Sequence, residues 1–135
     1  VFQGSIAWKG RRMSTFDPDA FAAAWNSHDI DQLMAMSSED CIFLASAGPA
    51  PGGTMYSGQM AVRAAYQALF KAFPDGQWTN SRATAIGGNR VLVEWQFSAT
   101  KSDGQPMLVD GLDILDITAG KVRVKNSYRK SIISG

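Results

Sequence analysis

Residues 89–117, NRVLVEWQFSATKSDGQPMLVDGLDILDI, predict two long strands joined by a tight turn. The first strand places on one side Val91, Val93, Trp95, Phe97 and Ala99, which alternate with residues of the opposite side. A period of two in a segment rich in β-branched and aromatic side chains is typical of a strand. Ser102-Asp103-Gly104 supplies the turn, so we expect an antiparallel hairpin.

The length of that turn decides which carboxylate faces the apolar side of the hairpin. A three-residue loop with a left-handed Gly104 pairs Trp95 with Gly111 and Val93 with Asp113. Asp113 then lies among apolar residues. A two-residue loop would shift the register by one residue and turn Asp110 inward instead. Either register predicts an acid on the inner face of the sheet.

Helices precede this hairpin. Asp17 followed by Pro18 predicts an N-cap, and the helix after it has an apolar face at helical spacing. A short helix over 30–36, a strand over 41–45 and a loop over 47–56 follow, and the loop is a candidate lid or pocket rim. A long helix over 58–73, capped by Ser57, is expected to pack through Met60, Ala61, Ala64, Ala65, Ala68, Leu69 and Ala72.

Further strands are predicted over 78–86 and 121–133, on either side of the hairpin in the sequence. Helices followed by a run of antiparallel strands define an α+β fold with the helices on one face of a curved sheet. The other face is too apolar to stay exposed, because it carries Leu92, Leu108, Leu112, Ile114, Val122 and Val124. A homodimer formed through this outer sheet face is therefore expected.

Composition excludes several classes of function. Hydrophobic residues make up 45% and charged residues 19% of the 135 residues, as in a folded soluble protein. The net charge of +1 gives no reason to expect a nucleic acid or a membrane as partner. The single histidine, His28, stands in a predicted turn without other metal-binding residues near it, so no metal site is expected.

The N-terminal residues are set apart from the domain. Phe2-Gln3-Gly4-Ser5 resembles the remnant of a tag-removal protease site, and Met13 resembles a natural start. We therefore expect residues 1–12 to be an added or flexible segment and residues 13–135 to form a single domain. No apolar segment follows Arg11-Arg12 as in a secretory signal, so a cytoplasmic location is expected.

Several motifs resemble one superfamily. These are Trp25-Asn26-Ser27-His28-Asp29-Ile30-Asp31, Asp40, the helix that opens at Gly58 and ends at Phe73-Pro74-Asp75, and Gly120-Lys121-Val122 with Tyr128. Together, over about residues 14–130, they resemble the nuclear-transport-factor-2-like superfamily, and within it the SnoaL-like and ketosteroid-isomerase-like group. The resemblance implies a cone: a curved antiparallel sheet wrapped around the N-terminal helices, with an apolar pocket inside and dimers on the outer sheet face.

The catalytic residues of that group are only partly matched. At the positions of the isomerase base and oxyanion-hole tyrosine stand Ala45 and Phe21, whereas Tyr66 and Asp113 are similar to the supporting tyrosine and the donating aspartate. The acid/base aspartate of the SnoaL-like cyclases falls on Ser127, and their partner histidine falls around Thr100-Lys101. Neither set is intact, so steroid isomerase activity is not expected.

The residues nonetheless predict a site. If both turns of the last three strands are three-residue loops, Asp113 lies opposite Lys125, and we assign these two as the candidate catalytic pair. The pair is either a salt bridge that only fixes the strand register or an acid/base site. If Lys125 reaches Asp113, the carboxyl is an anion and a base. If Lys125 points to solvent, the carboxyl is protonated and donates a hydrogen bond. The candidate substrate-binding residues are Phe21, Trp25, Tyr56, Tyr66, Trp95, Phe97, Ser127 and Arg129.

Two classes of function remain open from the sequence. One is a cofactor-free enzyme of isomerase, cyclase or dehydratase type that acts on a small apolar or weakly anionic molecule. The other is a non-catalytic ligand-binding or dimerisation module. An open cavity with Asp113 exposed in it would favour the enzyme, and a cone filled by side chains would favour the module.

Overall fold

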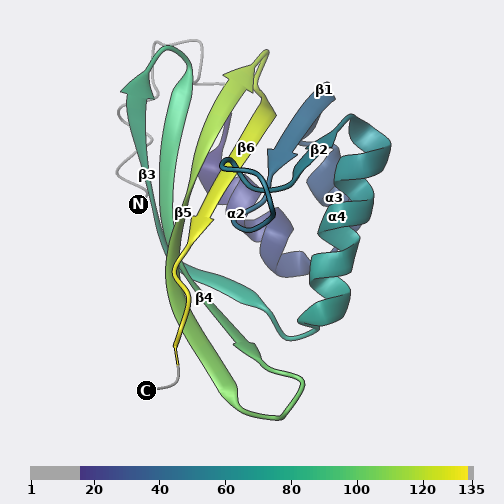
Figure 1. The fold of residues 1–135 in the computed structure, drawn as a ribbon. Coiled ribbons are helices and arrows are strands. Elements are labelled where there is room, and N and C mark those ends of the chain that lie inside the picture. Colours follow the sequence, from purple (N-terminus) through teal and green to yellow (C-terminus); the bar gives the residue numbers. More distant parts are fainter. Residues whose placement is uncertain (1–15, 134–135) are drawn as a thin grey trace.

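The computed structural model describes residues 16–133, in which helices cover one face of a curved six-stranded sheet (Figure 1). The predicted α+β fold is confirmed. The helices are α2 (Pro18–Ser27), α3 (Ile30–Met34) and α4 (Gln59–Ala72). The strands are β1 (Ser37–Leu44), β2 (Met55–Ser57), β3 (Gln77–Gly87), β4 (Arg90–Thr100), β5 (Pro106–Thr118) and β6 (Lys121–Arg129). The expectation for residues 1–12 lies outside the described residues.

The strand order in the sheet is β2-β1-β6-β5-β4-β3. Strands β3 to β6 form one antiparallel meander, as predicted. The sheet is not wholly antiparallel, however, because β1 pairs in parallel with β6. Between β1 and the far edge strand β3 the chain runs through β2 and α4, and the meander then returns its last strand to the side of β1 (Figure 1). None of the helices of the described residues has the length and hydropathy to cross a membrane.

The central hairpin has the register of the three-residue loop. Val93 pairs with Asp113, Trp95 pairs with Gly111, and Gly104 has a φ of 85°. Such a positive φ favours glycine, because a Cβ would crowd the backbone. Asp110 lies on the outer face, where its Oδ1 accepts a hydrogen bond of 3.0 Å from Gln96 Nε2.

The second turn differs from its expected length. Thr118 pairs with Lys121, which leaves Ala119 and Gly120 as a two-residue turn with φ values of 51° and 77°. A bulge then follows, because Ile117 pairs with Val122 but Asp116 pairs with Val124. Turn and bulge together place Ser127, and not Lys125, opposite Asp113. The two-residue turn also pairs Val122 with the inward-facing Ile117, and Val122 is 2% exposed in the core, so its assignment to the outer face was wrong.

The helix boundaries follow local chemistry with one exception. Asp17 caps α2 as predicted, its Oδ1 accepting from the amides of Asp19 (3.0 Å) and Ala20 (3.2 Å). The long helix α4 is not capped by Ser57, because Ser57 is the last residue of β2 and pairs with Ile42. Gly58 is the N-cap instead, with a φ of 89° and no side-chain hydrogen bond. Strand β2 was not expected, because its first two residues, Met55 and Tyr56, belong to the stretch 47–56 that was predicted to be a loop.

Helix α4 packs through a different face from the predicted one. Val62 and Tyr66 are its buried residues, at 0% and 2% exposure, whereas Met60 is 88% exposed. Ala64, Ala68 and Ala72 are exposed as well. Ala65, Ala68 and Ala72 of the predicted face border a cavity instead of the core.

Candidate functional site

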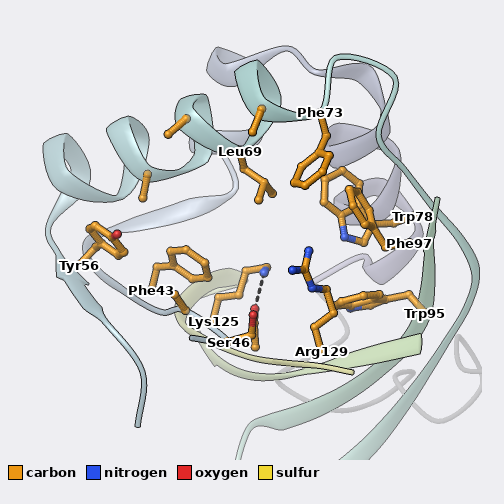
Figure 2. Close-up of a pocket in the computed structure, with 15 residues that line it drawn as sticks. Phe43, Ser46, Tyr56, Leu69, Phe73, Trp78, Trp95, Phe97, Lys125 and Arg129 are labelled. Atoms are coloured by element: carbon orange, nitrogen blue, oxygen red, sulfur yellow. Dashed lines mark hydrogen bonds between the residues drawn. The ribbon is translucent and has the colours of Figure 1, made fainter. Parts of the chain in front are cut away.

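A cavity of about 330 Å³ lies between α4 and the inner face of the sheet (Figure 2). Its apolar lining comes from Phe43, Ala45, Ala65, Ala68, Leu69, Ala72, Phe73, Trp78, Trp95 and Phe97, and its polar lining from Ser46, Tyr56, Lys125, Ser127 and Arg129. A mainly apolar cleft with a few convergent polar groups is the usual form of a small-molecule site. The loop between β1 and β2 forms part of its rim.

That loop is held in place by its own backbone. Ala45 N donates to Thr54 O at 2.9 Å, and Thr54 N donates to Ala47 O at 3.0 Å. Gly53, with a φ of 80°, lies so close to the Ala45 carbonyl that a Cβ would overlap it. Of the two predicted roles, lid or rim, the packing supports a fixed rim.

Asp113 and Lys125 form a buried ion pair, with Lys125 Nζ 3.2 Å from Asp113 Oδ1 and side-chain exposures of 8% and 7% for Lys125 and Asp113. Ser127 Oγ donates to Asp113 Oδ1 at 2.6 Å, and Trp95 Nε1 donates to Asp113 Oδ2 at 3.0 Å. Lys125 Nζ in turn donates to Ser127 Oγ at 2.6 Å. Three donors thus converge on one carboxylate. Of the two alternatives for Lys125, the structure has the one in which it reaches Asp113, although the two residues do not lie directly opposite each other.

The cavity reaches the partners of Asp113 but not Asp113 itself. Lys125, Ser127 and Trp95 all line the cavity, whereas Asp113 lines only a small adjoining pocket of about 20 Å³, together with Phe21 and Trp25. The arrangement that would favour an enzyme, an open cavity with Asp113 exposed in it, is therefore present only in part: the cavity exists, but Asp113 does not line it. A ligand in the cavity would contact the Lys125 ammonium and the Ser127 hydroxyl, which are both bound to the Asp113 carboxylate outside the cavity lining.

Aromatic rings surround the Lys125 ammonium. Its Nζ lies 4.8 Å from the ring centroid of Trp25 and 4.9 Å from that of Phe43. Cation–π attraction of this kind strengthens when the cation is withdrawn from water. Tyr66 lies against the same rings, and burial, with the charge of Asp113 as a smaller contribution, raises the pKa of Tyr66 well above its ordinary value. Its hydroxyl therefore remains protonated at neutral pH.

The predicted site residues divide into two groups. Tyr56, Trp95, Phe97, Lys125, Ser127 and Arg129 line the main cavity, whereas Phe21, Trp25 and Tyr66 are buried in the core beside the ion pair. The sequence reasoning missed Phe43, Ala45, Ser46, Ala65, Ala68, Leu69, Ala72, Phe73 and Trp78. Alternation along β1 offered a signal for Phe43 and Ala45. The α4 residues gave no separate signal, because a cavity-lining face and a core face share the same helical period.

No group of three or more His, Cys, Asp or Glu side chains arranged to hold a metal ion occurs within residues 16–133.

A curved sheet closed by helices around an apolar cavity defines the nuclear-transport-factor-2-like, cystatin-like class of α+β proteins. Residues 19–124 match the family model of the SnoaL-like domain, and the chain belongs to that family. No protein with a curated description matches the chain.

Solved structures with similar folds include a putative polyketide cyclase from Xanthomonas campestris pv. campestris, at 22% identity and a TM-score of 0.71 over 82% of this chain and 84% of that one. A putative polyketide cyclase from Pseudomonas putida KT2440 has 17% identity and a TM-score of 0.73, with coverage of 87% and 90%. A putative isomerase from Bacillus subtilis has 16% identity and a TM-score of 0.70, with coverage of 82% and 81%. At these identities the likeness concerns the fold.

Proposed function

We propose that the protein binds a small apolar molecule in the cavity and, as a cofactor-free enzyme of isomerase or cyclase type, stabilises negative charge that develops on an oxygen of that molecule. The observation that carries this proposal is the position of Lys125. Lys125 lines an otherwise mainly apolar cavity and is only 6% exposed. Its ammonium is held by Asp113 and Ser127. A preorganised donor in a site withdrawn from water is the usual way in which proteins stabilise an oxyanion.

The proton that leaves such a substrate has a connected route through a hydroxyl group. Ser127 lines the cavity, and its Oγ donates to the Asp113 carboxylate. In enolisation, the C–H bond of the substrate breaks, its electron pair moves toward the carbonyl oxygen, and Lys125 stabilises the resulting oxyanion. Ser127 accepts the proton while it passes its own proton to Asp113 Oδ1. Reversal of these steps at another carbon completes an isomerisation without a cofactor.

The second candidate function is non-catalytic ligand binding. No carboxylate or imidazole is among the described residues that line the cavity, so no strong base meets a ligand directly. A binding protein needs only the apolar walls and the cation. The enzyme and the binding protein therefore share the cavity and differ in whether protons move.

One probe tests both candidates. 2-Acetylnaphthalene carries an apolar ring, a carbonyl oxygen and exchangeable methyl protons, and its binding is measured by quenching of tryptophan fluorescence, since Trp78 and Trp95 line the cavity. We expect saturable binding, weakened at least about tenfold by Ala68→Phe, which fills the cavity. Ala64→Phe makes the same change on an exposed part of α4 outside the cavity lining and should leave binding unchanged.

The chemical step is followed by the loss of the methyl proton signal in D₂O. An enzyme should accelerate this exchange, and Lys125→Met should reduce the acceleration by about 10²–10³, the usual loss for one oxyanion donor. Binding without exchange would favour the non-catalytic function. Equal binding by wild type and Ala68→Phe would contradict both.

We also propose a homodimer through the outer sheet face. Leu112, Ile114, Leu92 and Val124 lie there half-buried, and the exposed Tyr128 pairs with Leu112 across the sheet. The ion pair Arg90–Asp116 lies at one end of this surface, and Glu94, paired with Arg82, lies opposite Leu112 within it. A mainly apolar patch with some charged groups is the usual composition of an interface.

Light scattering at micromolar concentration should report a dimer for the wild type, because specific interfaces of about 1,200–2,000 Å² are stable there. Leu112→Glu should give a monomer, since it would bury an unpaired charge between the subunits. Lys101→Gln, at an exposed position in the β4–β5 connection away from these residues, should remain a dimer. A monomeric wild type would refute the proposal.

A further inference from the structure

Arg129 brings a second cation to the cavity. It is the last residue of β6, lies four residues beyond Lys125 on the same side of the strand, and lines the cavity. Its guanidinium lies 6.0 Å from the ring centroid of Phe97. Figure 2 shows the Lys125 and Arg129 side chains both pointing from the sheet into the cavity, toward Leu69 and Phe73 on the other side.

The two cations differ in their charge balance. Lys125 is neutralised by Asp113, whereas Arg129 takes part in none of the ion pairs found among residues 16–133. The described residues that line the cavity include no acid. The cavity therefore holds one positive charge in excess, carried by an exposed residue at its edge, where water and salt partly screen the charge.

The ring of Trp95 lies beside Arg129. Arg129 pairs with Gly111 of β5, and the Trp95 ring occupies the place that a Cβ of Gly111 would take. A group bound to the guanidinium would thus have the aromatic side chains of Trp95 and Phe97 near it. The planar fork of arginine matches a carboxylate, which it can bind through two parallel hydrogen bonds.

The size and walls of the cavity restrict the remainder of the ligand. About 330 Å³ is near the lower limit of small-molecule sites, which corresponds to a compact molecule. Aromatic rings line the part of the cavity near Arg129: the centroids of Trp78 and Phe97 lie 4.7 Å apart, and those of Phe73 and Phe97 lie 5.3 Å apart. Offset or edge contacts with such rings favour a flat aromatic ligand.

From these observations we infer that the ligand class is a compact aromatic carboxylate whose acid group pairs with Arg129 and whose ring system extends toward Lys125. This inference rests on the proposed function, because it concerns the same cavity. It adds the charge and the orientation of the ligand: acid at the Arg129 end, and the oxygen on which charge develops at the Lys125 end.

The test compares 2-naphthoate with 2-naphthamide, two probes of nearly the same shape that differ by one negative charge. Tryptophan fluorescence at neutral pH gives the dissociation constant of each. We expect the wild type to bind the acid about fivefold more tightly than the amide, the upper range for an exposed ion pair. Arg129→Gln should bring the two constants within about twofold of each other, mainly by weakening the binding of the acid. Arg129→Lys should retain part of the preference.

Lys121→Gln serves as the matched control, since it removes one positive charge from an exposed position at the other end of β6 and should keep the full preference for the acid. If the wild type binds acid and amide equally, or if Arg129→Gln keeps the preference, the inference is refuted. Binding of 2-acetylnaphthalene that Ala68→Phe weakens would in that case still support the proposed function. If none of the three aromatic probes binds, both the inference and the proposed function are refuted.

Discussion

Asp113→Asn is expected to lower the free energy of unfolding by about 3 kcal/mol or more. The substitution leaves the Lys125 ammonium buried without its anion, and the removal of one partner of a buried pair costs about 3–5 kcal/mol. The side-chain exposures of 8% and 7% leave little water to replace the lost charge, although the change is nearly isosteric. Urea unfolding at neutral pH measures the effect.

Two variants isolate its cause. Asp116→Asn makes the same chemical change on the outer face of the same strand, where the ion pair with Arg90 has side-chain exposures of 50% and 44%, and should cost less than about 1 kcal/mol. The double variant Asp113→Asn/Lys125→Met removes both charges and should recover much of the lost stability. An unchanged unfolding curve for Asp113→Asn would show that the ion pair is not buried as described.

Gly111→Ala is expected to cost about 3 kcal/mol, a large effect for one added methyl group. Its Cβ would overlap Cη2 and Cζ3 of Trp95 and come within 2.8 Å of the Tyr128 carbonyl oxygen. Trp95 would have to move, and with it the 3.0 Å hydrogen bond from its Nε1 to Asp113. Overpacking costs about 1–3 kcal/mol, and the loss of a hydrogen bond to a charged group adds about 1.5–3 kcal/mol. The midpoint of urea unfolding measures the sum.

Gly52→Ala is the control, because no atom lies within 4 Å of its added Cβ, and it should change stability by less than about 0.5 kcal/mol. The clash itself is tested in a Trp95→Phe background, in which the overlapping ring atoms are absent. Gly111→Ala should cost clearly less there than in the wild type. Equal losses of stability in the two backgrounds would show that contact with the Trp95 ring is not the cause of the destabilisation.

Much of the fold was predictable from local pattern. The period of two in 90–99 and the turn at Ser102-Asp103-Gly104 were sufficient for the central hairpin. They left two registers open, and the structure has the one that places Asp113 inward and Asp110 outward. Asp17-Pro18 was sufficient for the start of α2. These features depend on neighbouring residues, whose preferences for strand, turn and cap act over a few positions.

The sequence predicted several residues of the candidate site but not how they are arranged. Lys125, Ser127 and Arg129 were expected inside the fold and do line the cavity. Contact between Lys125 and Asp113 was one of two alternatives, and it is the one that the structure has. That Asp113 lies behind Lys125 and Ser127, with Phe21 and Trp25 in the adjoining core, was not expected. A residue on the inner face of a sheet can border either a cavity or packed side chains, and the periodicity of its strand is the same in both cases.

The sequence by itself therefore determined the elements, the faces of the central hairpin and the presence of a buried acid, because these follow from interactions between residues close in the chain. Only the tertiary structure decided the pairing of Asp113 with Ser127, the inward turn of Val122 and the empty space beside the α4 alanines. The bulge in β6 and the parallel contact between β1 and β6 arise from closing the sheet around the helices. That closure joins residues far apart in the sequence, and no local pattern records its geometry.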